Sequence, residues 1–184
     1  MNRLALVAVL LAAPLAVTAC DTLAVRTTGE MTPLFRAEYP RYAGEGRDFR
    51  VVTLDDGKTL GGTETLRAAM IEGLQKNARF PTRFTATPRN HDADYRVALI
   101  FNPAPNVQAR DLCREPIPSL AFAAAGETHL LGAFCLAGDL LVEANAFTNG
   151  IAAAGDSRFQ AMMKAFTLQL FPMQDLRPED TPAD

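Results

Sequence analysis

The sequence contains no tryptophan and only two serines, Ser119 and Ser157. Neither serine stands in a Gly-x-Ser-x-Gly motif, so the sharp turn that exposes the nucleophile of many serine hydrolases is missing. The formal net charge is −3, whereas a nucleic-acid-binding surface requires a dense excess of lysine and arginine. These absences predict a protein that is not a serine hydrolase of this kind and that has no nucleic-acid partner.

Carboxylates and histidines are present, but no catalytic or metal-binding motif arranges them. His91, Asp92 and Asp94 lie within four residues, yet neighbours this close in a turn rarely converge on one ion. A glycosidase needs two paired carboxylates, and the sequence neither pairs any nor offers tryptophan to stack on a sugar ring. The carboxylates considered for such a pair are Asp55, Asp56, Asp139 and Glu143. We predict no catalytic residue, no metal site and no cofactor.

Long uncharged runs are also rare, and the longest one opens the chain. Arg3 is followed by residues 4–20 without a charge, and Pro14 interrupts this stretch. A positive start, a short apolar middle and small residues at the end are typical of a secretory signal peptide. Because a membrane-spanning helix needs about 20 apolar residues, we expect a cleaved signal rather than a transmembrane anchor.

The signal ends in Val17-Thr18-Ala19-Cys20. This order of an aliphatic residue, a tolerant position, a small residue and cysteine resembles the lipobox of bacterial lipoproteins. The resemblance implies that residues 1–19 are removed, that the Cys20 thiol receives a diacylglyceryl group, and that the new amino terminus is usually acylated. Two or more acyl chains hold a protein on a bilayer almost permanently. The alternative is an ordinary secreted protein whose signal happens to contain a cysteine.

The resemblance places the chain on the periplasmic side of a bacterial membrane, with the lipid as its membrane contact. Asp21 follows the modified cysteine directly. An aspartate at this position resembles the inner-membrane retention signal of enteric lipoproteins, so the inner membrane is favoured and the outer membrane stays open.

Residues 51–66 contain Gly57-Lys58-Thr59, which resembles the end of a phosphate-binding P-loop. The motif also requires a glycine five positions before Gly57, and that position is Val52. A periplasmic location also offers no pool of ATP. Asp55-Asp56-Gly57-Lys58 is instead typical of a turn after a strand, followed by a helix capped by Thr63. We predict no nucleotide as cofactor or partner.

Two cysteines, Cys113 and Cys135, remain once Cys20 carries lipid. An even pair in an oxidising compartment predicts a disulfide, which would stabilise the fold by roughly 3 kcal/mol. Two separate buried thiols or a metal pair are the alternatives. No Cys-x-x-Cys spacing is present, so the sequence does not indicate a dithiol redox catalyst.

The apolar pattern predicts five strands and two helices. Short β-branched or alternating segments predict strands over residues 49–54, 82–87, 95–102, 129–135 and 140–147. Stripes of helical period predict helices over residues 64–77 and 156–171, the second capped by Asp156. Together they indicate an α+β fold: a two-layer α/β sandwich with a mixed, mainly antiparallel sheet of about five strands and two helices on one face.

We expect four regions along the chain: a cleaved signal (1–19), a lipidated tether (20–47), a globular α/β domain (48–172) and a polar tail (173–184). Within the tether, one short strand or turn, or the rings of Phe35, Tyr39 and Tyr42, could pack on the domain.

Residues 103–127 form a long connection with four prolines, and this connection contains Cys113. Long loops without a periodic pattern are usually functional or fixed by a cross-link. The connection either folds onto its own core or leaves an apolar patch for a partner.

We therefore expect a non-enzymatic accessory or structural binding module of a cell-envelope complex, with an envelope protein as its partner. The order of elements and the anchor resemble small periplasmic lipoproteins that assist envelope machines, such as penicillin-binding-protein activators and transporter auxiliary lipoproteins. A small-ligand or lipid-binding domain is the second hypothesis, and it predicts a pocket of several hundred Å³ between helices and sheet, lined by phenylalanine and methionine. An enzyme built around His91 and Asp94 is the third.

Overall fold

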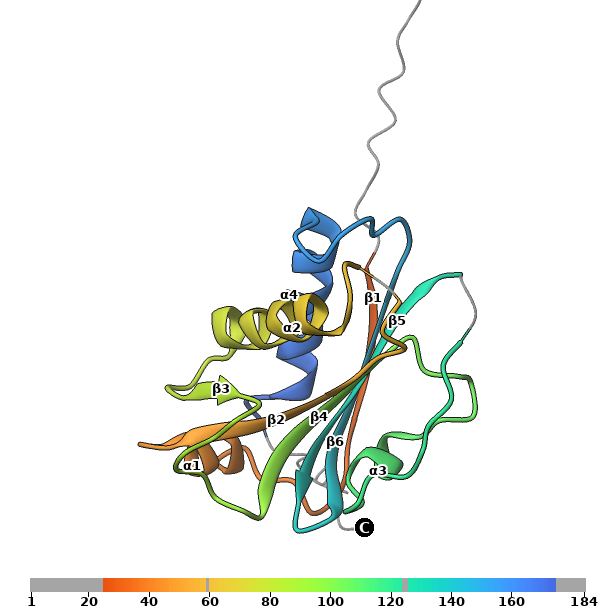
Figure 1. Ribbon diagram of the computed structural model, residues 1–184. Coiled ribbons are helices and arrows are strands. Elements are labelled where there is room, and N and C mark those ends of the chain that lie inside the picture. The colour runs from red at the N-terminus through yellow and green to blue at the C-terminus, as the bar shows by residue number, and fades with distance from the viewer. Residues whose placement is uncertain (1–24, 59, 124–125, 175–184) are drawn as a thin grey trace, which may run out of the picture.

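The computed structural model of the protein describes residues 25–58, 60–123 and 126–174 (Figure 1). The predicted signal, the predicted lipid site Cys20 and the tail from residue 175 onward lie outside this part. No helix in the described ranges is long and apolar enough to cross a membrane. The elements are β1 (Arg26–Met31), α1 (Tyr39–Gly44), β2 (Asp48–Leu54), α2 (Thr63–Asn77), β3 (Arg83–Thr85), β4 (Tyr95–Phe101), α3 (Ala109–Leu112), β5 (Thr128–Leu136), β6 (Asp139–Thr148) and α4 (Ser157–Leu170).

One six-stranded mixed sheet organises the fold, with the strand order β1-β6-β5-β4-β2-β3. Four strands form an antiparallel series from β1 to β4, whereas β2 runs parallel to both β4 and β3. The two long helices, α2 and α4, lie together on one side of the sheet, and the short α3 lies on the other (Figure 1). The predicted α+β class is confirmed, and the sheet has one strand more than the five predicted.

The additional strand, β1, lies in the range 20–47 that we predicted to be a tether, in which we allowed for one short strand or turn packed on the domain. All six of its residues pair with β6, from Arg26 opposite Phe147 to Met31 opposite Val142. Phe35, which follows it, is only 2% exposed. The fold therefore extends to about residue 25. The segment Arg26–Met31 shows no apolar alternation because it forms the edge of the sheet and most of its side chains face solvent.

The face of the sheet that carries α2 and α4, here the helix face, contains the main core. The large side chains that are fully buried there include Phe49, Phe134, Phe159, Phe166, Leu66 and Met70. Two glycines show how closely α4 packs against the sheet and against α2. A Cβ on Gly132 of β5 would lie 2.4 Å from the Phe166 ring, and one on Gly73 of α2 would lie 2.7 Å from Met163. Side chains fill the space between α4 and the sheet at Gly132 and between α2 and α4 at Gly73.

The predicted N-terminal cap of α4 is confirmed, whereas the predicted cap of α2 is wrong. Asp156 caps α4 as predicted, because its carboxylate accepts a hydrogen bond of 2.8 Å from the Arg158 amide. Thr63 was predicted to cap α2 and does not. It is the first helical residue, Gly62 holds the cap position at φ +94°, and the Thr63 hydroxyl instead donates to Asp55 Oδ1 over 2.9 Å. The same carboxylate oxygen accepts from the Gly57 amide, which forms the predicted turn.

The opposite face, here the outer face, is covered by part of the long connection. Ala109, Leu112 and Cys113 pack there in a second buried cluster with Ala133 and Cys135 of β5. The cluster also contains Ala98, Ile100 and Leu131. Residues 103 and 122 form a bridge that closes the connection upon itself. Of the two alternatives stated for this connection, the packing of its described residues favours a loop that folds onto its own core.

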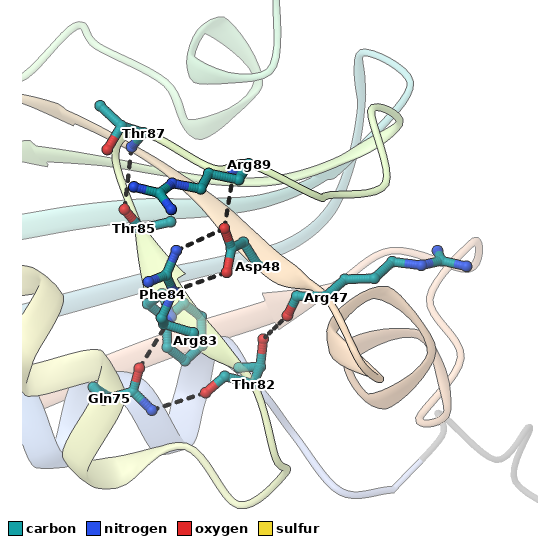
Figure 2. A network of polar contacts seen from close by, with 9 residues as sticks. All are labelled: Arg47, Asp48, Gln75, Thr82, Arg83, Phe84, Thr85, Thr87 and Arg89. Carbon is teal, nitrogen blue, oxygen red and sulfur yellow. Dashed lines mark hydrogen bonds and ion pairs between the residues drawn. The ribbon is translucent and has the colours of Figure 1, made fainter.

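Strand β3, at one edge of the sheet, has only three residues and is held by side chains (Figure 2). Asp48 accepts from Arg83 Nε at 2.8 Å, from Arg83 Nη2 at 2.9 Å and from the Arg89 amide at 2.8 Å. On the other side of the strand, the Gln75 amide group accepts from the Phe84 N–H at 3.0 Å and donates to the Thr82 carbonyl at 2.9 Å. The Gln75 side chain thus occupies backbone groups that a further strand would need.

The Asp48 carboxylate shows the electrostatic effect of this network. The hydrogen bond from Arg83, followed by that from the Arg89 amide, lowers the pKa of Asp48 from 3.8 to about 2. Because the folded-state pKa lies below the unfolded one, the pair stabilises β3 fully above about pH 4. That contribution is lost as the pH falls toward 2.

Candidate functional site

A groove of about 500 Å³ opens on the outer face between the β1–β6 pair and the segment around α3. We call it the outer groove. The residues that line it are Glu30, Thr32, Leu140 and Glu143 on the sheet side and Val107, Gln108, Ala109 and Arg110 on the α3 side. Glu143 lies directly opposite Ala133, which belongs to the buried cluster on the outer face. Glu30 in turn lies directly opposite Glu143. Since residues directly opposite share a face, both glutamates point to the outer face.

A disulfide fixes the α3 side of the outer groove to the sheet. Cys113, directly after α3, is bonded to Cys135 of β5, as the sequence predicted. Both cysteines are fully buried. Because the bond joins the end of α3 to a central strand, the groove wall cannot move far from the sheet while the bond is intact.

Arg96 of β4 makes a second attachment beside the disulfide. Arg96 is only 5% exposed, and it lies opposite Cys135 in the sheet. One guanidinium nitrogen donates to the carbonyl oxygens of residues 112–114, with 2.8 Å to Arg114. The other pairs with Glu115, which also binds Arg50 over 2.9 Å. Burial lowers the pKa of Arg96, but a guanidinium stays charged in proteins, so it satisfies the carbonyls at the end of α3.

The sheet side of the outer groove carries an unbalanced negative charge. Glu30 and Glu143 face each other across β1 and β6, and like charges directly opposite destabilise a sheet. Glu143 accepts a hydrogen bond of 2.8 Å from Asn145, whereas Glu30 has no ion-pair partner among the described residues. Arg110 lies on the α3 side of the groove and also has no ion-pair partner among the described residues. The sheet side of the groove can therefore accept a positive group.

A polar and aromatic row continues from the groove along the outer face. His129 Nε2 lies 2.8 Å from Asn145 Oδ1, and Asn145 in turn donates to Glu143. The His129 ring stacks on Phe147 with 4.2 Å between centroids, and Arg26 lies 4.9 Å above the Phe147 ring. Burial lowers the pKa of His129, which favours its neutral form. The row presents hydrogen-bonding groups and a flat ring beside the groove.

The residues considered for catalysis or metal binding are not assembled into one site. Asp92 binds Arg47 over 3.0 Å and accepts from the Asp94 amide over 3.1 Å, so this turn is held by its own contacts. Within the described ranges, no three histidine, cysteine, aspartate or glutamate side chains are placed to hold a metal ion. Among Asp55, Asp56, Asp139 and Glu143, only Glu143 lines the outer groove.

Sequence reasoning missed Glu30, Arg96 and Arg110. Glu30 was missed because a strand within residues 20–47 was expected only as one of several options and without bounds. Arg96 was missed because it stands in an otherwise apolar strand, and its partners, residues 112–115, lie 16 to 19 positions further along the chain. The signal for part of the groove was present, since Glu143, Asn145 and Phe147 alternate along a predicted strand and so share its polar face.

Comparison with known proteins gives a likeness of fold. No protein-family model matches the sequence, and no curated protein matches it. The fold resembles PelC from Paraburkholderia phytofirmans, in a structure of the PelC dodecamer and in one of a point-variant dodecamer. The sequence identity is 8% in both cases, with TM-scores of 0.42 and 0.41. The alignments cover 83% and 84% of this chain and the whole PelC chain.

Proposed function

We propose that this protein is a lipid-anchored, non-enzymatic accessory protein on the periplasmic side of a bacterial membrane, and that it binds another envelope protein through the outer groove. The observation that carries the proposal is the construction of the groove. Its α3 side is attached to the sheet by the Cys113–Cys135 disulfide and by buried Arg96. A binding surface fixed in advance loses little conformational freedom when a partner docks, which favours binding.

The lipobox supports the location. Cys20 and Arg26, the first residue of β1, are six positions apart. An extended chain covers at most about 3.5 Å per residue, so a lipid on Cys20 would keep the start of β1 within about 20 Å of the bilayer surface. The outer groove, which Glu30 and Thr32 line at the other end of β1, would then lie within reach of envelope proteins that extend from the same membrane.

The alternative, a ligand pocket between helices and sheet, has less support. Phe166 is fully buried and packs against Gly132 of the sheet, and Met163 is fully buried and packs against Gly73 of the neighbouring helix α2. The outer groove lies on the other face of the sheet, and charged or polar side chains make up much of its lining. We therefore favour a polar, protein-binding role for it over storage of an apolar ligand.

A photoreactive residue in the groove tests the proposal. We would replace Arg110 by benzoyl-phenylalanine in the full chain, expressed in its own bacterium, and replace exposed Lys164 on α4 as the matched control. The expected result is a covalent adduct with one envelope protein from position 110 and none from position 164. Absence of an adduct from position 110, or the same adducts from both positions, would contradict the proposal.

A further inference from the structure

The two edge strands of the sheet differ in length and in whether a side chain covers their outward backbone groups. The β3 edge is three residues long, and the Gln75 side chain occupies its outward backbone groups at Thr82 and Phe84 (Figure 2). The β1 edge is six residues long, and no described strand lies beyond it. Unpaired edges invite pairing with another chain, and natural proteins usually block them. Among the residues that the structure describes, side chains block only the β3 edge.

The hydrogen-bond pattern identifies which groups of β1 are free. The Thr32 amide, one residue beyond β1, donates to the Leu141 carbonyl over 2.9 Å. In an antiparallel pair, successive residues direct their N–H and C=O groups alternately toward the partner strand and away from it. Arg26, Thr28 and Glu30 therefore bond to β6. The backbone groups of Thr27, Gly29 and Met31 point to the open edge.

The carboxylates beside the β1 edge favour a partner segment that carries a positively charged side chain. Side chains of a strand added next to β1 would alternate between the two faces of the sheet. Those on the outer face would lie beside Glu30 and at the mouth of the outer groove. Glu30 faces Glu143 and forms no ion pair within the described residues, and Arg110, on the α3 side of the outer groove, pairs with neither glutamate there. A lysine or arginine at that position would relieve the repulsion between the two carboxylates.

We propose that β1 accepts an extended segment of the envelope partner as a seventh strand, and that a lysine or arginine of this segment binds Glu30 and Glu143. This inference rests on the proposed function and specifies how the outer groove recognises its partner. Hydrogen bonds to Thr27 and Gly29 supply pairing that does not depend on sequence, and the glutamate pair supplies selectivity.

A second copy of this chain fits the edge less well. In a symmetric antiparallel pair centred on Thr28, Arg26 of one copy would lie opposite Glu30 of the other. However, Arg26 already binds both carboxylate oxygens of Glu127 at 2.9 Å. The antiparallel arrangement would also direct the two Cys20 anchors to opposite ends of the pair. A basic segment of another protein neither needs Arg26 to leave Glu127 nor brings a second Cys20 anchor.

The first test removes one outward amide. Thr27→Pro deletes an N–H that makes no bond within the sheet, and proline is tolerated on edge strands. Thr27→Ala retains the N–H and serves as the matched variant. In cells carrying the photoreactive residue at position 110, we expect Thr27→Pro to reduce the yield of the partner adduct at least tenfold. Thr27→Ala should retain it.

A charge reversal tests the inference without altering the backbone. Glu30→Lys would offset Glu143 and repel a basic segment, so we expect a chain at least as resistant to urea and an adduct yield reduced about tenfold. The partner peptide recovered from the adduct should contain a lysine or arginine. Full adduct yield in both Thr27→Pro and Glu30→Lys would overturn strand addition and leave the proposed function standing. An adduct with a second copy of this chain would overturn the inference, and no adduct in the unsubstituted chain would remove both proposals.

Discussion

Replacing both Cys113 and Cys135 by alanine is expected to lower the free energy of unfolding by about 3 kcal/mol. The two cysteines are 22 residues apart, so the disulfide closes a loop long enough to restrict the unfolded chain substantially. Urea denaturation, followed by circular dichroism, measures the change. Reduction of the unsubstituted protein should produce a similar loss, which controls for any effect of the alanines. A loss below about 1 kcal/mol would show that the bond does not constrain the chain in this way.

The same variant should loosen the α3 side of the outer groove before the rest of the fold. Without the disulfide, residues 107–112 are attached mainly through the carbonyl contacts of Arg96 and the buried side chains of Ala109 and Leu112. Local opening becomes easier where few contacts remain. Amide hydrogen exchange should therefore accelerate in this segment, while α2 and α4 keep their protection under native conditions.

Gly132→Ala is expected to cost up to about 3 kcal/mol, the upper part of the usual range for an overpacked core. The new methyl would lie 2.4 Å from the Phe166 ring and 2.9 Å from Leu99 Cδ2. Both neighbours are fully buried and have little room to move. Gly155→Ala is the matched control, because nothing lies within 4 Å of its Cβ position. Thermal and urea unfolding of the two variants, side by side, would measure the difference.

The outcome at Gly132 also distinguishes a core that side chains fill from a core with unfilled space. If the alanine were accommodated as easily at Gly132 as at Gly155, the layers would contain unfilled space. The hypothesis of an apolar ligand between helices and sheet would then regain support. A large loss at Gly132 alone would agree with a core that side chains already fill.

Much of the fold could be predicted because the local pattern and the tertiary packing agree. Helix α4 has an apolar stripe, a capping aspartate and Pro172 after its end, and the structure has the helix there. The β5–β6 hairpin was predicted from two apolar segments around Gly138, which adopts φ +94° at the turn. Each of these segments is long enough for its period to be recognised.

The elements that were missed depend on contacts remote in sequence. Strand β1 consists mostly of polar residues and glycine, and its pairing with β6 joins residues more than 100 positions apart. Thr63 looked like a helix cap, but Asp55 lies within reach of its hydroxyl only in the folded chain. The outer groove could not be predicted as a whole because Glu30 and Arg110 are brought together by β1 and by the disulfide-bonded loop.

The location of the protein is the claim on which the proposed partner and its approach to the groove both depend. An intact-mass measurement of the full-length gene product, purified from bacterial membranes, tests it most directly. We expect a mature chain that begins at Cys20 and is heavier than the bare polypeptide by a diacylglyceryl group, usually with a further acyl chain. A chain that still begins at Met1, or one that begins at an unmodified Cys20, would contradict the account.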